Sequence, residues 1–378
     1  MSNQYDDIVI GVGGMGSTTA YHLAKRDRDV LGLERYDIPH SMGSSHGISR
    51  IIRLAYYEHP SYVPLVRRSY ELWNEIQKEQ GEQLLFETGS IDAAPPEDPL
   101  FRGSRRSCEE YDIDHEVLSG SEVNDRYPGY DLPEEHMAVY QPNGGYVLSE
   151  RAIVAHVTQA QREGARIQAR ERVIDWEPHE GGVRVETDRD EYTADNLVIA
   201  SGAWAGKQIE ALEGIAVPQR QVLAWLQPQE PAQFMPENYP VWNLQVEEGR
   251  FYGLPVVKVP GFKFGRYMHR QQDVDPDAMN REPEPEDETL LREFANNYFP
   301  QGTGPTMGLA TCMFTNTPDG HFVIDRHPEY PQVVFGAGFT GHGYKFAPVI
   351  GEVLADLASE GRTEHPIDFL GLDRFDGV

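Results

Sequence analysis

The stretch from Cys312 to Glu352 combines residue types that could hold and use a redox cofactor. Cys312 is one of only two cysteines, and it precedes a glycine-rich loop at residues 336–346 that carries Lys345 and is expected to open a helix. A glycine-rich turn at a helix N-terminus presents backbone N–H groups and the positive end of the helix dipole to an electron-rich ligand. A second such turn occupies residues 11–16. Two such turns predict one elongated cofactor with two electron-rich regions, which is typical of a dinucleotide flavin.

Residues 7–36 must position the N-terminal turn. They predict a strand at 8–10, the glycine turn, a helix over 17–26 and a second strand that ends in Glu34. In such a βαβ unit the glycines allow a tight turn and close approach of a pyrophosphate, while the acid accepts a hydrogen bond from a ribose hydroxyl. An acid at this place disfavours a 2′-phosphate, so NADP is not expected. NAD remains open on this motif alone, but it would leave Cys312 and the C-terminal loop unexplained.

Two arginines three residues apart form a second constellation, at Arg50 and Arg53. They project on one side if the segment is helical, or straddle a turn if it is not. The planar guanidinium suits two-point binding of a carboxylate, which lysine cannot reproduce. Solvated surface arginines are the alternative, but Ile51 and Ile52 between them make exposure a poor explanation.

The pattern of elements predicts an α/β protein of two domains. A buried strand near residues 196–206, after a hairpin-like pair at 182–187 and 191–194, should complete the sheet begun by residues 7–36. We therefore expect a discontinuous, Rossmann-like cofactor-binding domain built from residues 1–85, 145–218 and 308–378. Residues 86–144 and 219–307 are richer in Pro, Tyr and Trp, and would form a substrate-binding domain with a mostly antiparallel sheet that roofs the cofactor.

The composition limits the partners and the location of the protein. With 33 basic and 61 acidic residues the net charge is −28, which argues against nucleic acid as a partner. There is no apolar run long enough to span a membrane, no secretory signal and no disulfide framework, so a cytoplasmic protein is predicted. The alternative to two reduced cysteines is a single Cys108–Cys312 disulfide bridge. Dispersed acids with only six lysines favour a halophilic cytoplasm over an ordinary acidic enzyme.

The chain resembles the monomeric sarcosine oxidase and N-methyltryptophan oxidase family of amine-oxidising flavoproteins. The resemblance extends over nearly the whole chain, and its specificity comes from four motifs together: the N-terminal glycine turn, residues 40–53, residues 252–263 and residues 312–352. It implies that FAD is the cofactor and that Cys312 bonds to the flavin ring through sulfur. Without the resemblance, Cys312 would be interpreted as a buried packing residue. Cys108 matches no motif.

The resemblance also assigns roles to cationic residues. Arg53 and Lys345 would pair with the substrate carboxylate, Arg50 would lie near the flavin face, and Lys263 would lie at the flavin edge where oxygen is reduced. A fixed positive charge at Lys263 would stabilise the superoxide that forms when an electron passes to O₂. The alternative for each lysine is a side chain that extends along the surface to solvent.

The chain also departs from the family pattern around the substrate. The family places a histidine just after the position of Tyr267, where this chain has Met268 and then His269. Two alternatives follow: His269 substitutes with a shift of one residue, or Met268 takes the role. Phe314 replaces a family tyrosine, Ser45 replaces the first of two adjacent histidines, and Tyr252 matches a cavity tyrosine. These changes leave the flavin machinery intact and put the substrate in doubt.

We therefore expect an oxidase of a secondary or tertiary amino acid, such as sarcosine, another N-methyl amino acid or a cyclic imino acid such as pipecolate, with O₂ as the electron acceptor. A related dehydrogenase that passes electrons to a carrier, and a flavin-bearing binding protein, are the alternatives. The chain should act as a monomer without metal, membrane or nucleic acid. The expected catalytic residues are Arg50, Tyr252, Lys263 and His269, with Arg53, Lys345 and Tyr252 binding substrate. The expected cofactor-binding residues are Gly11, Gly13, Gly14, Gly16, Glu34, Arg35, Ser44, Val173, Ser201, Gly202, Cys312, Gly338, Gly341, Gly343 and Lys345.

Overall fold

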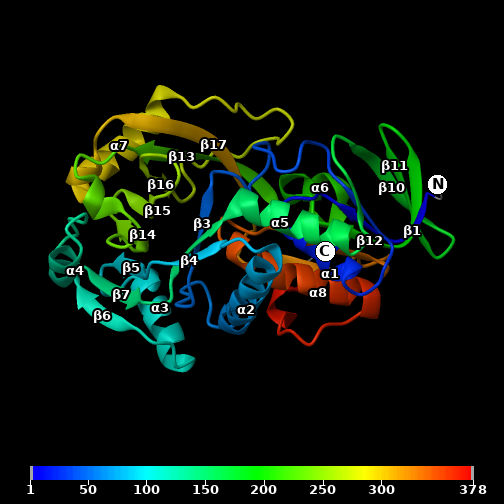
Figure 1. Cartoon of the computed structure of the whole chain (residues 1–378), viewed down its shortest axis with the longest axis horizontal. Helices are drawn as coiled ribbons and strands as arrows, with labels where there is room; N and C mark the ends of the chain where they lie inside the picture. Colours follow the sequence, from blue (N-terminus) through cyan, green and yellow to red (C-terminus); the bar gives the residue numbers. More distant parts are fainter. Residues whose placement is uncertain (1–2, 376–378) are drawn as a thin grey trace.

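The computed structural model describes residues 3–375, which form three β-sheets and the helices that cover them. In Figure 1 the sheet that contains β1 and β12 lies toward the right of the view, and the sheet that contains β13 to β16 lies toward the left. The mixed α/β class predicted from the sequence is confirmed.

The first sheet is the one that the N-terminal βαβ unit predicts. Its path runs β10 (Val173–His179), β11 (Gly182–Thr187), β12 (Glu191–Ile199), β1 (Gln4–Ile10), β2 (Val30–Leu33) and β9 (Arg166–Gln168), with β19 (Val333–Ala337) beside β12 and β18 (Val323–Arg326) beside β19. β1 pairs in parallel with both β2 and β12, so the late strand does complete the N-terminal sheet.

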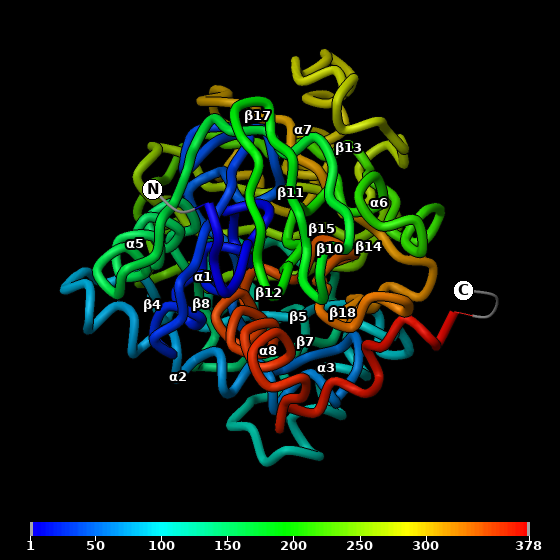
Figure 2. The backbone as a smooth tube through the Cα atoms, turned by 90° about the vertical axis from the view of Figure 1, so that its right-hand side faces the viewer, coloured from blue at the N-terminus to red at the C-terminus, as the bar shows by residue number. Residues whose placement is uncertain are grey.

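Three helices, α1 (Gly14–Ala24), α5 (Ser149–Arg162) and α8 (Ala347–Glu360), cover one face of this sheet, and α2 (Tyr62–Gln80) packs against them. α1 packs against both α5 and α8. Figure 2 shows α8 lying beneath the strands of the first sheet. The approach of α1 to α8 is close, because a side-chain carbon on Gly351 would lie 2.3 Å from Thr18 Oγ1. The N-terminal helix and the C-terminal helix are thereby fixed side by side.

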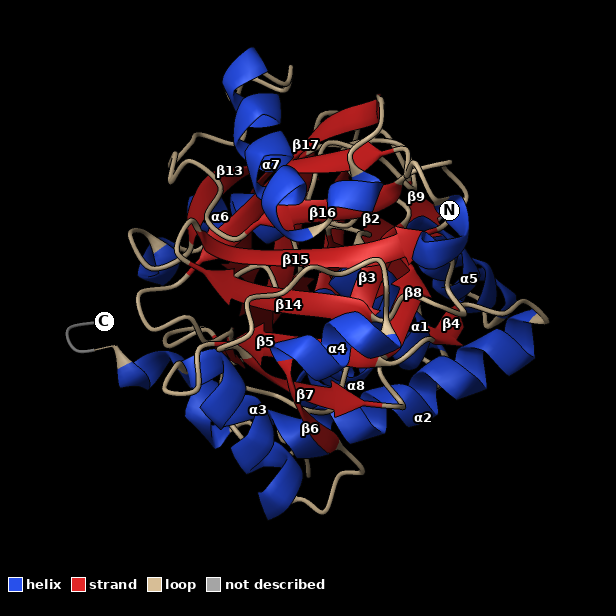
Figure 3. Cartoon of the chain, turned by 90° about the vertical axis from the view of Figure 1, so that its left-hand side faces the viewer, coloured by secondary structure: helices blue, strands red, loops and turns tan. Residues whose placement is uncertain are grey.

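The second sheet is almost entirely antiparallel. Its order is β17 (Thr306–Asn316), β13 (Val217–Leu226), β16 (Phe262–Arg266), β15 (Gly249–Val256), β14 (Val241–Val246), β5 (Ser90–Ala94), β7 (Met137–Gln141) and β6 (Glu116–Ser119), with β14 and β5 the parallel pair. One face packs on α7 (Pro285–Tyr298) through an aromatic cluster that includes Phe251 and Phe294. Figure 3 shows α7 lying across this sheet. The other face is free to cover a cofactor.

A small third sheet joins the two larger ones. It consists of β3 (Ser49–Ile52), β8 (Gly145–Leu148) and β4 (Leu85–Glu87). The segment with the two arginines is therefore a strand, neither of the two forms considered from the sequence, and Arg53 follows its end. The predicted domain bounds stay a prediction, although β17 lies in the second sheet and not with the cofactor segments that follow it.

The remaining elements are short. α3 (Pro99–Glu110) and α4 (Gly120–Arg126) flank the second sheet, and α6 (Ala205–Gln208) follows β12. Short 3-10 turns lie at Gly202–Trp204, Glu210–Leu212, Pro231–Phe234, Pro300–Gly302, Tyr344–Phe346, Asp368–Leu370 and Leu372–Arg374. Within residues 3–375, no helix combines the length and the apolar character that crossing a membrane requires.

Candidate active site

A cavity of about 350 Å³ runs along the carboxyl ends of the first sheet, where ligands bind in parallel α/β sheets. It brings together the two glycine loops that lie at opposite ends of the sequence. The predicted cofactor residues that line it are Gly11, Gly13, Gly14, Glu34, Arg35, Ser44, Val173, Ser201, Gly202, Gly341 and Gly343.

The other predicted cofactor residues lie elsewhere. A side-chain carbon on Gly16 would lie 1.7 Å from the Gly11 carbonyl oxygen, so this glycine allows α1 to pack closely on the turn. Gly338 has φ +61° and packs on Thr317. Lys345 lines a second cavity. Cys312 is buried beside the first cavity, which its neighbours Met313 and Phe314 line.

The N-terminal turn has the geometry of an anion cradle. α1 begins after Gly13 without a side-chain cap, which leaves N–H groups of its first turn for a ligand, and a side-chain carbon on Gly13 would meet no atom within 4 Å. Glu34 accepts hydrogen bonds from the backbone N–H groups of Val12 and Tyr36, each at 2.9 Å. Burial alone would raise the pKa of Glu34, but His40 and these N–H groups lower it, so the carboxylate stays charged and can accept from hydroxyl groups.

Two side chains that line the same cavity each carry a buried polar atom with no hydrogen-bond partner among residues 3–375: Ser201 Oγ and Gln208 Oε1. Buried polar groups in folded proteins are nearly always paired, so a bound polar group could supply the partner that each of them lacks. The uncapped helix end, the charged acid and these two atoms fit the phosphates and hydroxyls of FAD.

A second cavity, of about 40 Å³, adjoins the first one under the second sheet. Arg50, Gly341 and Tyr344 line both cavities, so the two spaces meet at these residues. All the predicted substrate-binding residues, and three of the four predicted catalytic ones, line this smaller space: Arg50, Arg53, Tyr252, Lys263 and Lys345. It is a candidate substrate site that opens on the cofactor cavity.

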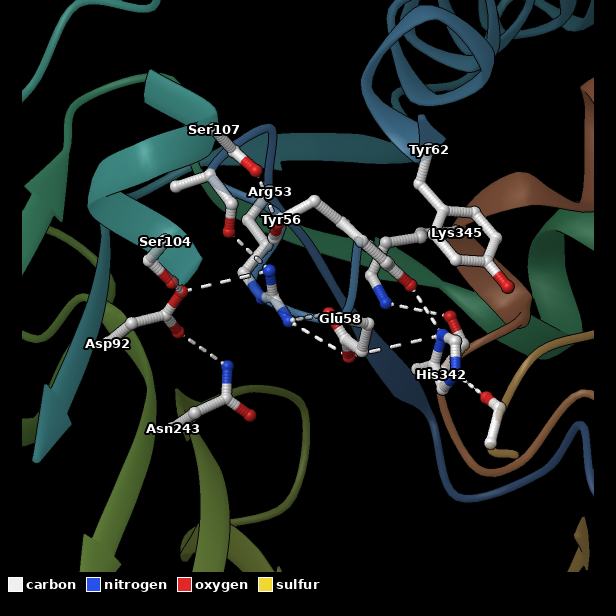
Figure 4. Close-up of polar contacts among 12 residues, drawn as sticks. Arg53, Tyr56, Glu58, Tyr62, Asp92, Ser104, Ser107, Asn243, His342 and Lys345 are labelled. Carbon is white, nitrogen blue, oxygen red and sulfur yellow. Dashed lines mark hydrogen bonds and ion pairs between the residues drawn. The ribbon is translucent and has the colours of Figure 1, made fainter. Parts of the chain in front are cut away.

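Arg53 is held by acidic groups that the sequence did not reveal. Its guanidinium, 2% exposed, donates to Glu58 at 3.0 and 3.2 Å and to the Ala55 carbonyl oxygen, and lies 3.7 Å from Asp92 (Figure 4). Burial alone would raise the pKa of Glu58, but Arg53, together with the other cationic groups around it, lowers that pKa to about 2. A carboxylate that binds Arg53 must therefore compete with Glu58.

Lys345 lies beside this pair. Its Nζ donates to the His342 carbonyl oxygen at 2.8 Å, and His342 in turn contacts the Tyr56 hydroxyl and the Gly320 carbonyl oxygen. Burial, followed by the charge of Arg53, lowers the pKa of Lys345 to about 7. The amine is thus close to half-protonated at neutral pH, and a nearby anion would draw a proton onto it.

Lys263 lies at the junction of β16 with the segment around β3. Its Nζ donates to the carbonyl oxygens of Gly47 and Ser49 and is 2% exposed. Burial first, and then the charge of Arg50, lowers the pKa of Lys263 well below its ordinary value. The positive charge predicted here from the sequence stays a prediction, and a negative charge that develops beside this amine would favour its protonated form.

Cys312 lies on β17 among groups that activate a thiol. Its Sγ is 3.6 Å from the Ser44 carbonyl oxygen and 3.9 Å from Arg50 Nη2. Burial alone would raise the pKa of Cys312, but His46 and Arg50 lower it to about 7. Burial raises the pKa of Cys108 to about 12, and both thiols are free, so the alternative of a Cys108–Cys312 bridge is excluded.

The comparisons with known proteins agree with this geometry. The family described as FAD dependent oxidoreductase matches residues 6–357. Monomeric sarcosine oxidase from Streptomyces avermitilis is 40% identical over 371 residues, which cover 97% of each chain. N-methyl-L-tryptophan oxidase from Yersinia pestis is 31% identical, covering 98% of this chain and 99% of its own.

The chain belongs to the FAD dependent oxidoreductases. The resemblance predicted from the sequence is confirmed, and FAD is the cofactor of this family.

Solved structures of the same fold resemble this FAD-dependent oxidoreductase over nearly its whole length. The open form of NikD, described as an unusual amino acid oxidase essential for nikkomycin biosynthesis, superimposes with a TM-score of 0.83 at 25% identity over 97% of each chain. L-proline dehydrogenase from P. horikoshii gives a TM-score of 0.84 at 22% identity, covering 99% of this chain and 98% of its own. At that identity the second likeness shows the fold alone.

The structure does not bring His269 to the cavity of this oxidoreductase. His269 is buried, with Nε2 2.9 Å from Asp287, and lines neither cavity. Tyr267 occupies the cavity wall instead, and Met268 is 42% exposed. Side chains of β16 alternate, so Lys263, Gly265 and Tyr267 share a face, and the positive φ of Met268 then turns the chain away. That period of two, applied from Lys263, could have identified Tyr267.

The other two departures lie at the flavin cavity. Ser45 and Phe314 both line it, and the Phe314 ring lies 5.5 Å from the Tyr267 ring. Phe314 therefore joins the wall between the cofactor and the substrate cavity through an apolar contact. Tyr252 lines the substrate cavity, with its ring 5.5 Å from that of Tyr267.

Proposed function

We propose that this protein is an FAD-dependent oxidase of a small secondary or tertiary amino acid, such as sarcosine. It would convert the amine to an imine, which water hydrolyses to an amine and an aldehyde, and reduce O₂ to H₂O₂. The observation that carries this proposal is the convergence of Arg53 and Lys345 on a small cavity that meets the FAD cavity at Arg50. The names of the relatives, sarcosine oxidase and N-methyl-L-tryptophan oxidase, support it.

The carboxylate of the substrate would bind at the end of the cavity formed by Arg53 and Lys345. A carboxylate there raises the pKa of Lys345 above 7, so binding takes up a proton and completes a pair of charged donors. Two fixed donors orient the substrate. A substrate held in this way reacts with the flavin as if the two were parts of one molecule, which lowers the entropic part of the barrier. The carbon next to nitrogen is then directed toward the junction with the FAD cavity.

Arg50 would act on the amine at that junction. A guanidinium does not lose its proton, so it disfavours a second positive charge beside it. The substrate amine is therefore favoured in its neutral form, whose nitrogen lone pair is needed when the carbon next to it is oxidised. When bound, FAD supplies the redox chemistry: it accepts the two electrons and passes them on to oxygen. Cys312, with a pKa lowered to about 7, would hold the flavin covalently through sulfur.

Lys263 supports an oxidase over a dehydrogenase. Its amine is buried beside Arg50 and becomes protonated most readily when a negative charge develops nearby, as in the reduction of O₂ to superoxide. The second candidate substrate class, cyclic imino acids such as pipecolate, fits the same cations.

The test is an anaerobic titration followed by exposure to air. Purified protein mixed with sarcosine, N-methyl amino acids or pipecolate should lose its visible flavin absorbance, and should regain it in air with one H₂O₂ released per turnover and no added acceptor. Bleaching without peroxide would favour the dehydrogenase, and no bleaching by any N-alkyl amino acid would contradict the proposal. We further propose a cytoplasmic monomer, in keeping with the monomeric relatives and with a charge that repels nucleic acid.

A further inference from the structure

The roof of the substrate cavity carries a polar row that has no part in the proposed chemistry. Strand register places Asp92 on β5 opposite Asn243 on β14, and Asn243 opposite Tyr252 on β15. Asn243 and Tyr252 line the cavity. Facing residues of neighbouring strands lie on the same face of a sheet, so the three side chains share the face that covers the substrate.

Asp92 fixes the orientation of the Asn243 amide. The Asp92 carboxylate is 1% exposed, accepts from Ser104 Oγ at 2.6 Å and from Asn243 Nδ2 at 2.7 Å, and lies 3.7 Å from Arg53. Burial raises the pKa of Asp92, while Arg53 and the two donors oppose that rise. The ion pair with Arg53 favours the carboxylate, which can only accept hydrogen bonds. The amide nitrogen must therefore face Asp92.

The amide oxygen of Asn243 is consequently the atom left for the cavity. Figure 4 shows the nitrogen directed at Asp92 and the oxygen turned away from it. Among residues 3–375 no donor reaches this oxygen, and it is not one of the fully enclosed polar atoms. Because Asn243 lines the cavity, the surface of its amide oxygen that stays accessible faces the cavity. The wall beside Arg53 thus presents one fixed, unsatisfied acceptor.

We propose that Asn243, oriented by Asp92, determines specificity by accepting a hydrogen bond from an O–H or N–H group on the substrate side chain. The inference rests on the proposed oxidase function and ranks its substrates: among small N-alkyl amino acids that carry a side chain, those with a side-chain hydroxyl or amino group are preferred. The physical reason is that a substrate without such a donor leaves the buried oxygen unpaired, and a site built for a hydrogen bond rejects the analogue that lacks it.

Two isosteric substrate pairs, each tested as both enantiomers, measure the effect. N-methylserine and N-methyl-2-aminobutyrate differ only in a hydroxyl against a methyl group. N,O-dimethylserine and N-methylnorvaline differ in an ether oxygen, which can only accept, against a methylene. The wild-type enzyme should prefer N-methylserine over its isostere by about 5- to 150-fold in kcat/KM. It should not prefer N,O-dimethylserine over N-methylnorvaline, because the ether oxygen and the Asn243 amide oxygen are both acceptors and cannot bond to each other.

Two substitutions separate recognition from a merely structural role. Asn243→Leu keeps the branched shape of the side chain and removes the acceptor, so the serine preference should fall to about 1. Asp92→Asn presents an amide nitrogen to Asn243, which turns the Asn243 amide so that its nitrogen faces the cavity. That variant should now prefer the ether over N-methylnorvaline by about 5-fold or more. Loss of packing alone would lower all four rates together and would not create a new preference.

The matched control is Asn297→Leu on α7, where the amide donates to Glu248 on the surface. It should leave both substrate ratios unchanged. A wild-type serine preference near 1, or one that survives in Asn243→Leu, would overturn the inference while leaving the oxidase proposal intact, provided that the flavin is still bleached. Absence of bleaching by every compound would instead contradict the oxidase proposal itself.

Discussion

The coupling between carboxylate binding and the protonation of Lys345 gives a direct test of the substrate site. The pKa of Lys345 is lowered to about 7 by burial and by Arg53. Below pH 7 the ammonium is already present and can pair with a bound carboxylate. Above pH 7 the free site holds a neutral amine, and binding must first take up a proton. The affinity for a small carboxylate should therefore fall as the pH rises through 7.

The size of the effect follows from the contacts. Each pH unit above 7 costs about 1.36 kcal/mol of binding free energy, so the Kd of propionate should rise about tenfold per unit. In Lys345→Met that slope should be absent. A hydrogen bond to a charged group contributes about 1.5–3 kcal/mol, so at pH 6 the variant should bind propionate about 10- to 150-fold more weakly than the wild-type enzyme.

The assay is a titration of the flavin absorption spectrum with propionate between pH 6 and 9. Propionate has no amine, so protonation of a substrate nitrogen does not contribute to the slope. The reasoning is wrong if Lys345→Met retains the wild-type pH dependence, since another group would then take up the proton. It is also wrong if the variant binds propionate as tightly as the wild-type enzyme at pH 6.

Four further outcomes are expected. Cys312→Ser should release its yellow colour on acid precipitation, whereas the wild-type protein should keep it and show the mass of the flavin adduct; equal release from both would refute attachment. Lys263→Met should slow the reaction of the reduced enzyme with O₂ by about 10²- to 10³-fold, measured by stopped flow, while anaerobic reduction by substrate changes much less. Asp287→Ala should lower the free energy of unfolding by about 3–5 kcal/mol in urea, because it leaves the buried Arg220 and His269 without their carboxylate; the exposed Asp275→Ala is the control, and an equal loss in both would contradict this. With a net charge of −28, the melting temperature should rise with KCl up to molar concentrations, and a flat response would refute a halophilic design.

Local patterns were sufficient to predict the cofactor side of the molecule. The N-terminal unit could be predicted because its turn, helix and acid lie within 30 residues, and the Glu34 carboxylate does reach the turn at Val12. Both glycine loops line one cavity, as two electron-rich regions of one cofactor require. The buried strand near residue 196 joined the sheet for the expected reason, because its apolar run suits a strand covered on both faces.

The substrate side could not be derived in the same way. Asp92 meets Arg53 only because β5 and the end of β3 come together from different sheets, and no spacing in the sequence encodes that contact. The lowered pKa of Lys263 depends on burial and on the charge of Arg50, and a residue type reveals neither. His269 keeps the two-residue phase of Lys263 and Tyr267, but the positive φ of Met268 turns the chain before it, and the residue types do not reveal that turn.

The position of Cys312 makes its reactivity a property of the finished molecule. The groups that lower its pKa, His46 and Arg50, are more than 260 residues earlier in the chain, and Sγ meets Arg50 only once β17 has paired within the second sheet. A nascent chain still on the ribosome holds an ordinary, mostly protonated thiol. Tethering of the prosthetic group would therefore follow release and maturation, and its extent would report the fraction of polypeptide that has acquired its native conformation.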